Sequence, residues 1–134
     1  MSSKYLLDTN MLIYWSKGMP TVVRNIVEHG TRSLSASILS RAELYYGAHR
    51  SQHVDKNLKS IKKLTEEIKF ISINEDIENL FGKHKANLRK DGNLIEDFDL
   101  MIAATALSYN YTLVTNNEQH FKRITELKIE NWAI

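Results

Sequence analysis

The sequence has no cysteine, only one proline and only five glycines among its 134 residues. Without cysteine, the chain has no disulfide, no thiolate for a metal ion and no cysteine nucleophile. So little proline and glycine argues against long flexible linkers and low-complexity tails. We therefore expect a single domain over residues 1–134, which is close to the usual size of one domain.

Long apolar runs are also missing. No stretch of the sequence approaches the roughly 20 apolar residues that a helix needs to cross a bilayer. The first residues lack the basic region and apolar region of a signal peptide. Together with the absence of cysteine, these features predict a cytoplasmic protein that does not associate with membranes.

Neither sign of charge dominates, because 18 Lys and Arg residues balance 16 Asp and Glu residues to a net charge of +2. This net charge does not by itself indicate nucleic-acid binding. Basic side chains do gather in two segments, residues 56–63 and 83–90. Such clusters are most often solvated helix faces, and the alternative is a basic rim that follows a nucleic-acid backbone.

Hydrophobic patterning predicts strands that alternate with helices. The short apolar runs typical of buried strands cover residues 5–7, 33–37, 70–73, 112–114 and, marginally, 128–129. The segments with helical character cover residues 11–15, 21–29, 41–49, 54–67, 76–88 and 97–109. This alternation predicts an α/β fold with a central parallel sheet of four or five strands and helices on both faces. Since parallel crossovers share one hand, the carboxyl ends of the strands should meet at one edge.

Asp8 has the most informative position among the acids. It directly follows the apolar run at residues 5–7, and ligands of open α/β sheets bind at the carboxyl edge of the strands. The position suggests a site built around this carboxylate. An N-cap for the helix that begins near Met11 explains Asp8 about equally well.

Glu43 and Asp99 follow later strands in the same way. Glu43 is predicted in the first turn of a helix capped by Ser40, where an acid stabilises the helix dipole by roughly 0.3–1 kcal/mol, and taken alone this explanation is favoured. Asp99 also lies in a first turn, but Asp97 is better placed as a cap. The apolar run after Asp99 should draw its side chain inward, and a buried carboxylate is costly unless it is paired or coordinated.

The three acids together indicate more than any one of them. All are predicted at one edge of one sheet, and no Lys, Arg or His has an obvious position from which to neutralise them. Clustered carboxylates raise one another's pKa unless a cation lies among them. Oxygen ligands suit Mg²⁺ or Mn²⁺, and such an ion promotes phosphodiester cleavage. The pattern predicts metal-dependent hydrolysis of a nucleic-acid backbone.

Three polar residues, Thr115, Asn116 and Asn117, follow the fourth predicted strand at the same edge. One interpretation is a turn and helix cap, for which asparagine is well suited. The other is that a hydroxyl and an amide support the metal or its waters. The residues alone leave both interpretations open.

Several motifs occur in order along nearly the whole chain. They are Leu7-Asp8-Thr9-Asn10, Arg41-Ala42-Glu43-Leu44 with Tyr46-Gly47, Asp99-Leu100-Met101-Ile102-Ala103, and Leu113-Val114-Thr115-Asn116-Asn117 before Glu130-Asn131-Trp132. Each motif alone is weak, but the ordered set is specific. It resembles the PIN-domain toxins of VapBC toxin–antitoxin systems.

This resemblance implies a three-layer PIN fold and an endoribonuclease that depends on Mg²⁺ or Mn²⁺. Asp8 and Asp99 match the metal ligands of the family, and Glu43 matches the remaining acid, which helps to hold metal or orients the attacking water. The resemblance also implies a homodimer that is neutralised by a VapB-like antitoxin, in a larger assembly that binds operator DNA through the antitoxin. Several toxins of this branch cleave tRNA, including initiator tRNA, so tRNA is the favoured substrate and inhibition of translation the expected effect.

One position departs from the family pattern. Many PIN domains carry a fourth acid after the fourth strand, in a Thr-x-Asp pattern, where this chain has Asn117. Glu118 is adjacent, but a shift of one residue redirects a side chain near a helix start. Glu96 and Asp97 could compensate for the missing acid. The departure predicts one well-bound ion, with a second recruited only together with RNA, and Asn117 as a further site residue.

Two other functions stay open on the residues. A degenerate PIN domain could bind RNA or a protein partner without cleaving, which the absence of the fourth acid motivates. A phosphatase-type enzyme could use Asp8 as a nucleophile, but such sites usually have a second nearby acid, which the residues next to Asp8 do not provide.

Histidines and aromatic residues give weaker signals. The five histidines are scattered along the chain, which gives little support to a histidine ribonuclease, and His84 and His120 are expected on the surface. Trp15, Tyr45 and Tyr46 could stack on bases, although packing at a dimer or antitoxin interface is the favoured interpretation.

Overall fold

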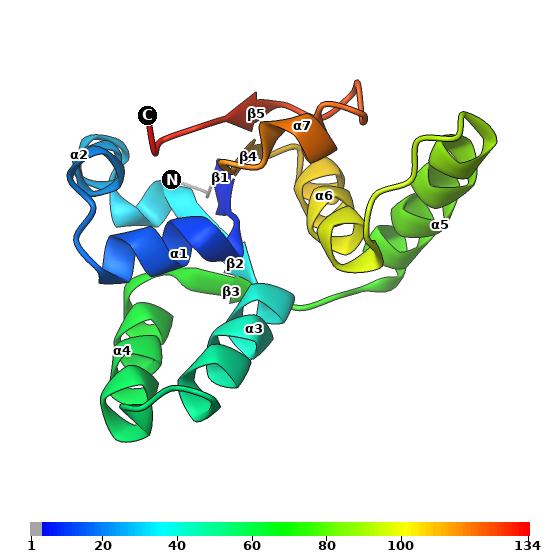
Figure 1. Cartoon of the computed structure of the whole chain (residues 1–134). Helices are drawn as coiled ribbons and strands as arrows, with labels where there is room; N and C mark the ends of the chain where they lie inside the picture. The colour runs from blue at the N-terminus through cyan, green and yellow to red at the C-terminus, as the bar shows by residue number, and fades with distance from the viewer. Residues whose placement is uncertain (1–3) are drawn as a thin grey trace.

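A computed structural model of the chain describes residues 4–134 and contains a five-stranded sheet among helices (Figure 1). The strands are β1 (Tyr5–Leu7), β2 (Leu34–Ser37), β3 (Lys69–Ile71), β4 (Thr112–Val114) and β5 (Ile129–Glu130). The helices are α1 (Thr9–Ser16), α2 (Pro20–His29), α3 (Ile38–His49), α4 (Val54–Glu67), α5 (Glu75–Lys90), α6 (Asp97–Tyr109) and α7 (Glu118–Phe121), with a 3₁₀ turn η1 (Thr31–Ser33).

All strand pairs are parallel, and the strand order is β3-β2-β1-β4-β5. The predicted parallel sheet is therefore confirmed, with β1 at its centre. Leu7 of β1 is in register with Val114 of β4. Asp8 and Thr115 each come one residue later, so the register of the sheet places them side by side at its carboxyl edge.

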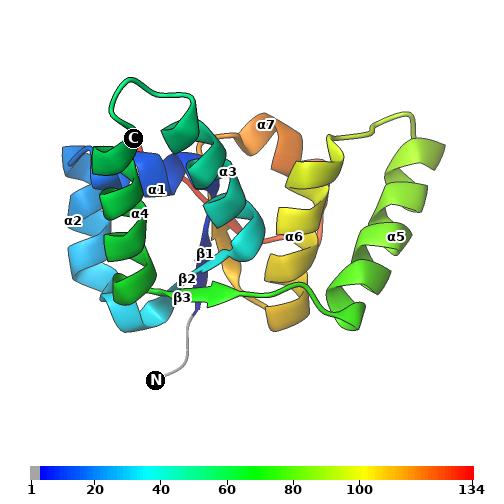
Figure 2. The same cartoon turned by 90° about the horizontal axis from the view of Figure 1, so that it is seen from below.

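Helices cover both faces of the sheet, which gives the predicted three layers. Figure 2 shows α1, α2 and α4 on one side and α5 and α6 on the other. Leu6 packs in the core beneath α5 and α6, whereas Leu7 packs in the core beneath α1, α2 and α4, and both are fully buried. Because side chains alternate along a strand, Asp8 points to the same face as Leu6, the face that α6 covers.

The start of α3 differs from the prediction. Ser40 was expected to cap a helix from residue 41, but α3 begins at Ile38, because the Ser37 hydroxyl accepts a hydrogen bond of 3.0 Å from the Leu39 amide. Glu43 is consequently the sixth residue of α3, beyond the first turn. The helix dipole, which acts on the first turn, does not explain why an acid occupies this position.

Helix α6 has the predicted bounds, residues 97–109, but not the predicted cap. Glu96 occupies the N-cap position without a side-chain hydrogen bond. The Asp97 carboxylate instead forms an ion pair with Lys85 of α5, 2.9 Å from the ammonium nitrogen. Asp97 is thus held by a surface ion pair between α5 and α6.

The last residues close the α1–α2 side of the molecule. The rings of His29 and Trp132 stack with centroids 4.5 Å apart, and Tyr5 packs edge-on against His29. Trp132 is 2% exposed and belongs to the core beneath α1 and α2. No helix in residues 4–134 is long and apolar enough to span a bilayer.

The two serines near the start of α3 give a test of its cap. Ser37→Ala should lower the free energy of unfolding by about 1 kcal/mol, because it removes the capping oxygen. Ser40→Ala should change it by less than about 0.5 kcal/mol or stabilise the protein, because the buried Ser40 hydroxyl has no hydrogen-bond partner. Urea unfolding of both variants measures this, and a larger loss for Ser40→Ala would contradict the observed cap.

Candidate functional site

Asp8 is the centre of the candidate site. The residue is 6% exposed at the end of β1. Oδ1 accepts a hydrogen bond of 2.8 Å from the Thr9 amide, and Oδ2 accepts one of 2.8 Å from the Thr115 hydroxyl. Asp8 is also the N-cap of α1. The capping interpretation is therefore correct, and it does not exclude a second role, since each carboxylate oxygen has more than one lone pair.

The surroundings of Asp8 raise the pKa of its carboxyl group above the ordinary value. Burial is the largest cause. The hydrogen bonds from Thr115 and Thr9 oppose it, and the negative charges of Asp99 and Glu43 raise the pKa further. The prediction that the strand ends bring these three acids into one electrostatic environment is confirmed.

Glu43 reaches this environment from α3. Its Oε1 accepts a hydrogen bond of 2.7 Å from the Thr9 hydroxyl, while the residue as a whole is exposed. Thr9 therefore binds two acids at once, Asp8 through its amide and Glu43 through its hydroxyl. Thr9 was not among the predicted site residues, although its place between Asp8 and α1 was visible in the sequence.

Asp99 lies in the first turn of α6 with its side chain 20% exposed. The His120 ring nitrogen Nδ1 is 3.4 Å from Asp99 Oδ2 and 2.9 Å from Asn117 Nδ2. The expectation that no basic side chain lies beside the acids was thus wrong at Asp99. The His120 side chain is 40% exposed, as expected of a surface residue, but its ring also lies against Asp99 and Asn117.

Thr115 joins the two halves of the site. It is fully buried, donates its hydroxyl proton to Asp8 and accepts a hydrogen bond of 2.9 Å from the Asn117 amide. The Thr115 hydroxyl thus binds the Asp8 carboxylate directly, and a supporting role toward a metal or its waters stays a prediction. A series of hydrogen bonds consequently runs from Glu43 through Thr9, Asp8, Thr115 and Asn117 to His120, whose ring lies beside Asp99.

Asn117 precedes α7 at the N-cap position, but its side chain makes no capping hydrogen bond. Its side-chain amide nitrogen Nδ2 contacts His120 Nδ1 instead. The capping interpretation of Asn117 is therefore wrong, and the amide lies within the site. A signal for this pair was present in the sequence, because Asn117 and His120 are three residues apart at the start of a helix and such residues are neighbours on its surface.

The donor set fits a divalent cation in its chemistry. In the part of the chain that the structure describes, Asp8 and Glu43 have no ion pair with Lys, Arg or His. Carboxylate oxygens are the ligands that Mg²⁺ and Mn²⁺ prefer, and a cation would relieve the repulsion that raises the Asp8 pKa. Across residues 4–134, no three Asp, Glu or His side chains converge as a complete metal-binding group. Asp8, Asp99 and Glu43 are the residues that could hold the ion.

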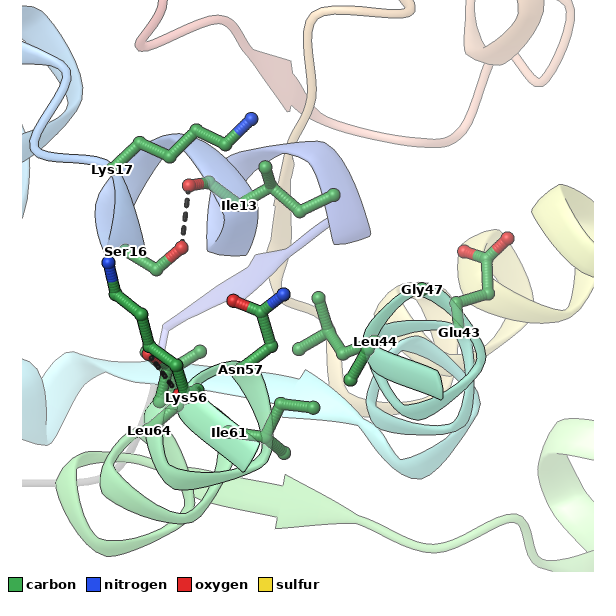
Figure 3. A pocket seen from close by; sticks show the side chains of 12 residues that line it. Ile13, Ser16, Lys17, Glu43, Leu44, Gly47, Lys56, Asn57, Ile61 and Leu64 are labelled. Carbon is green, nitrogen blue, oxygen red and sulfur yellow. Dashed lines mark hydrogen bonds between the residues drawn. The ribbon is translucent and has the colours of Figure 1, made fainter. Parts of the chain in front are cut away.

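A cavity of about 530 Å³ between α1, α3 and α4 adjoins the site at Glu43 (Figure 3). Apolar side chains of Ile13, Leu44 and Ile61 line its middle, and Lys17 and Lys56 lie away from Glu43 at the other end. Asp8 and Asp99 do not line it. The cavity is therefore a neighbouring surface that shares one acid with the site.

Other predicted positions lie outside the acid cluster. His84 is 6% exposed, which contradicts the expected surface position, and its Nε2 lies 4.0 Å from Glu126 Oε2. Tyr45 and Tyr46 are 41% and 68% exposed on α3, while Trp15 packs against the core beneath α1 and α2. The two tyrosines remain available for a partner or a base.

Comparisons with known proteins identify the family of the chain. The family described as PIN domain matches residues 5–127. A protein named Ribonuclease VapC1 from Haemophilus influenzae (strain R2866) is 38% identical over 131 residues, which cover 96% of this chain and 98% of the relative. One named tRNA(fMet)-specific endonuclease VapC from Shigella flexneri is 32% identical and covers 97% of this chain and 98% of its own. The structure of DNA-bound VapBC from Salmonella typhimurium has a TM-score of 0.90 at 30% identity, over 97% of this chain and 98% of that one.

The raised pKa of Asp8 predicts how stability depends on pH in the absence of divalent cations. Because the folded-state pKa lies above the unfolded one, stability falls as pH rises from the ordinary aspartate pKa through the raised value. The Asp8→Asn variant has no carboxyl group to ionise at this position, so it does not lose this stability. Its free energy of unfolding should therefore rise relative to that of the unsubstituted protein over this pH range. Urea unfolding at a series of pH values in chelator measures the difference, and a difference independent of pH would contradict the shift.

Proposed function

Because the chain belongs to the PIN-domain family and, within it, to the VapC ribonuclease toxins of VapBC systems, we propose that it hydrolyses RNA phosphodiester bonds with a divalent cation, Mg²⁺ or Mn²⁺, held by Asp8, Asp99 and Glu43. The observation that carries the proposal is the buried Asp8 carboxylate, whose pKa is raised by burial and by the other two acids. A divalent cation among these carboxylates would offset the repulsion between their charges.

The residues of the chain divide the work of such a site. A divalent cation bound there would lower the pKa of the attacking water and neutralise charge on the phosphate. Thr9 and Thr115 fix the Asp8 carboxylate by one hydrogen bond to each oxygen. Glu43 Oε1 accepts a hydrogen bond from the Thr9 hydroxyl. The other oxygen, Oε2, is left to accept a proton from a water molecule or to hold the cation. Its exposure gives this second oxygen access to solvent and substrate.

Basic side chains near the site support RNA as the substrate class. Lys17 and Lys56 line the end of the cavity opposite Glu43, and the exposed Lys63 follows on the same helix as Lys56. Ammonium groups spaced along a surface attract a phosphate backbone without reading its sequence. We propose that these lysines position the strand while the acids cleave it.

Among RNAs, tRNA is the proposed substrate, with initiator tRNA as the first candidate. The relative from Shigella flexneri carries the name tRNA(fMet)-specific endonuclease VapC. Cleavage of initiator tRNA removes the molecule that starts each polypeptide, so the proposed consequence is inhibition of translation.

A VapB-like antitoxin is the proposed partner that neutralises the activity. The solved relative from Salmonella typhimurium is a VapBC complex bound to DNA. We propose that this chain forms a homodimer and a larger complex with its antitoxin, and that this complex binds operator DNA through the antitoxin.

A non-catalytic RNA- or protein-binding module is the second candidate. It is favoured by Asn117, whose amide occupies the position of the usual fourth acid and contacts His120. Titration with Mn²⁺ and Mg²⁺ separates the candidates, because a module without a cation site binds neither ion, even with RNA present. For the third possibility, Asp8 as a phosphatase nucleophile, the structure offers no specific support: no Lys or Arg of residues 4–134 forms an ion pair with Asp8.

Substitution of the acids tests the catalytic proposal. Asp8→Asn and Asp99→Asn should each lower metal-dependent RNA cleavage by at least about a hundredfold, since each removes a charged ligand. Asp97→Asn is the matched control, because Asp97 lies in the same first turn of α6 but pairs with Lys85. It should retain activity. Undiminished cleavage by purified Asp8→Asn protein would refute the proposal, and a comparable loss in Asp97→Asn would give Asp97 the compensating role.

Mapping of 5′ ends in cellular RNA after brief expression tests the proposed substrate. New ends should accumulate in tRNA, first in initiator tRNA, and should be absent when the Asp8→Asn variant is expressed at the same level. New ends that depend on Asp8 but lie only in other RNAs would keep the ribonuclease and overturn the choice of tRNA.

A further inference from the structure

We propose that Asn10, Tyr14 and Asn116 form a subsite that hydrogen-bonds the ribose 2′-hydroxyl of a nucleotide beside the scissile phosphate, and that this subsite selects RNA over DNA. The inference rests on the proposed function, because it concerns the substrate of the same site. It deepens that function by giving three uncharged residues, none of them among the acids, a part in the choice of nucleic acid.

The chemistry of the proposed reaction calls for such a subsite. A water attacks the phosphorus and an oxygen of the chain leaves, so the 2′-hydroxyl takes no part in the step and a DNA phosphodiester could react in the same way. Lysines attract the phosphates, which RNA and DNA share. A protein distinguishes RNA from DNA at a given nucleotide through the 2′-hydroxyl. A preference for RNA therefore needs a further group that binds this hydroxyl.

The three side chains meet at the same edge of the sheet as the acids. Asn10 comes two residues after Asp8, and Asn116 directly follows Thr115, whose hydroxyl binds the Asp8 carboxylate. Asn10 Nδ2 donates a hydrogen bond of 3.3 Å to Asn116 Oδ1, and Asn116 Nδ2 donates one of 2.9 Å to the Tyr14 hydroxyl. An uncharged polar cluster thus adjoins the buried pair of Asp8 and Thr115.

Helix α1 presents two members of the cluster on one face. Asn10 and Tyr14 are four residues apart on this helix, so they are neighbours on its surface. Asn10 and Asn116 are exposed, whereas Tyr14 is half-buried and its ring packs against the core beneath α1 and α2. The ring anchors the Tyr14 hydroxyl, and the two exposed amides are open to a ligand.

Hydrogen-bonding groups are left over in this cluster. Among the described residues, neither Asn10 Oδ1, an acceptor, nor the hydroxyl proton of Tyr14, a donor, has a hydrogen-bond partner. Exchanging nitrogen and oxygen in both amides reverses the two hydrogen bonds, and it then leaves a donor on Asn10 and an acceptor on Tyr14. A 2′-hydroxyl both donates and accepts, so it can bind the cluster in either arrangement.

A purely structural role does not account for the cluster. Strands β1 and β4 are already joined beside it, because the Asp8 amide donates to the Val114 carbonyl at 2.9 Å and the Thr115 hydroxyl binds the Asp8 carboxylate. Exposed hydrogen bonds between uncharged side chains add little to stability. Uncharged groups also bind phosphate less strongly than Lys or Arg, so the cluster suits a hydroxyl better than the backbone charge.

Single 2′-deoxy substitutions in the substrate test the inference. The RNA is the one cut in the mapping experiment above, synthesised with a deoxyribose at one nucleotide at a time on either side of the scissile bond. At one of these positions the substitution should lower kcat/KM of the unsubstituted protein at least about fivefold, because it removes a hydrogen bond. A 2′-fluoro substitution, which keeps the ribose pucker but cannot donate, should also lower it there.

Variants of the cluster should lose this sensitivity. Asn116→Ala should cleave the all-ribose substrate at least about fivefold less efficiently, and the deoxy substitution should then cost it little more. Tyr14→Phe keeps the ring in the core and should show the same reduced sensitivity, which covers the case in which Asn116→Ala fails to fold. Asn79→Ala is the matched control, because Asn79 is exposed on α5, and it should retain the full cost of the deoxy substitution.

The outcomes separate the two proposals. If cleavage depends on Asp8 but no deoxy position lowers kcat/KM, or if the cost is unchanged in both Asn116→Ala and Tyr14→Phe, the subsite is overturned and the proposed function stands. If the unsubstituted protein cleaves no RNA, the proposed function fails, and binding of RNA and DNA of one sequence in chelator then decides the subsite. A preference for RNA that Asn116→Ala loses supports it, and equal binding of both overturns it.

Discussion

The buried carboxylate of Asp8 at the end of the central strand is the constraint on which the site depends. A charge with 6% exposure is tolerated only if its oxygens are bound. The protein binds one oxygen with the first amide of α1 and the other with the hydroxyl that follows β4. The parallel register makes this possible, because Asp8 and Thr115 each come one residue after a paired position, Leu7 and Val114.

From Asp8, hydrogen bonds extend in both directions and connect three helices. Thr9 of α1 leads to Glu43 on α3, and Thr115 leads through Asn117 to His120 on α7. This arrangement disfavours the ionised form of Asp8, since burial and the other two carboxylates raise its pKa. Folds commonly accept such local destabilisation where a ligand later compensates it. Here the acids lie close together despite their repulsion because the parallel sheet places them at its carboxyl edge.

Sequence reasoning found what depends on pattern and missed what depends on three-dimensional contact. Alternating strands and helices gave the parallel sheet, and the parallel sheet gave a shared edge for Asp8, Glu43 and Asp99. It placed the cap of α3 at Ser40 instead of Ser37, because serine is a good capping residue at either position and the pattern does not fix where the strand ends. It missed His120, because the orientation of a four-residue helix after a loop is set by the burial of Phe121 and not by any periodicity.

The two interpretations of Asp8, helix cap and site residue, are compatible, because the cap orients the carboxylate of the site. Serine, threonine or asparagine would cap α1 about as well as aspartate, so capping alone does not explain a buried charge at this position. The cap nevertheless holds the carboxylate in one orientation, with Oδ1 on the Thr9 amide and a second lone pair on each oxygen left over. A ligand that is oriented before the cation arrives loses less entropy on binding it. The structural role of Asp8 therefore orients its carboxylate for the chemical role that we propose for it.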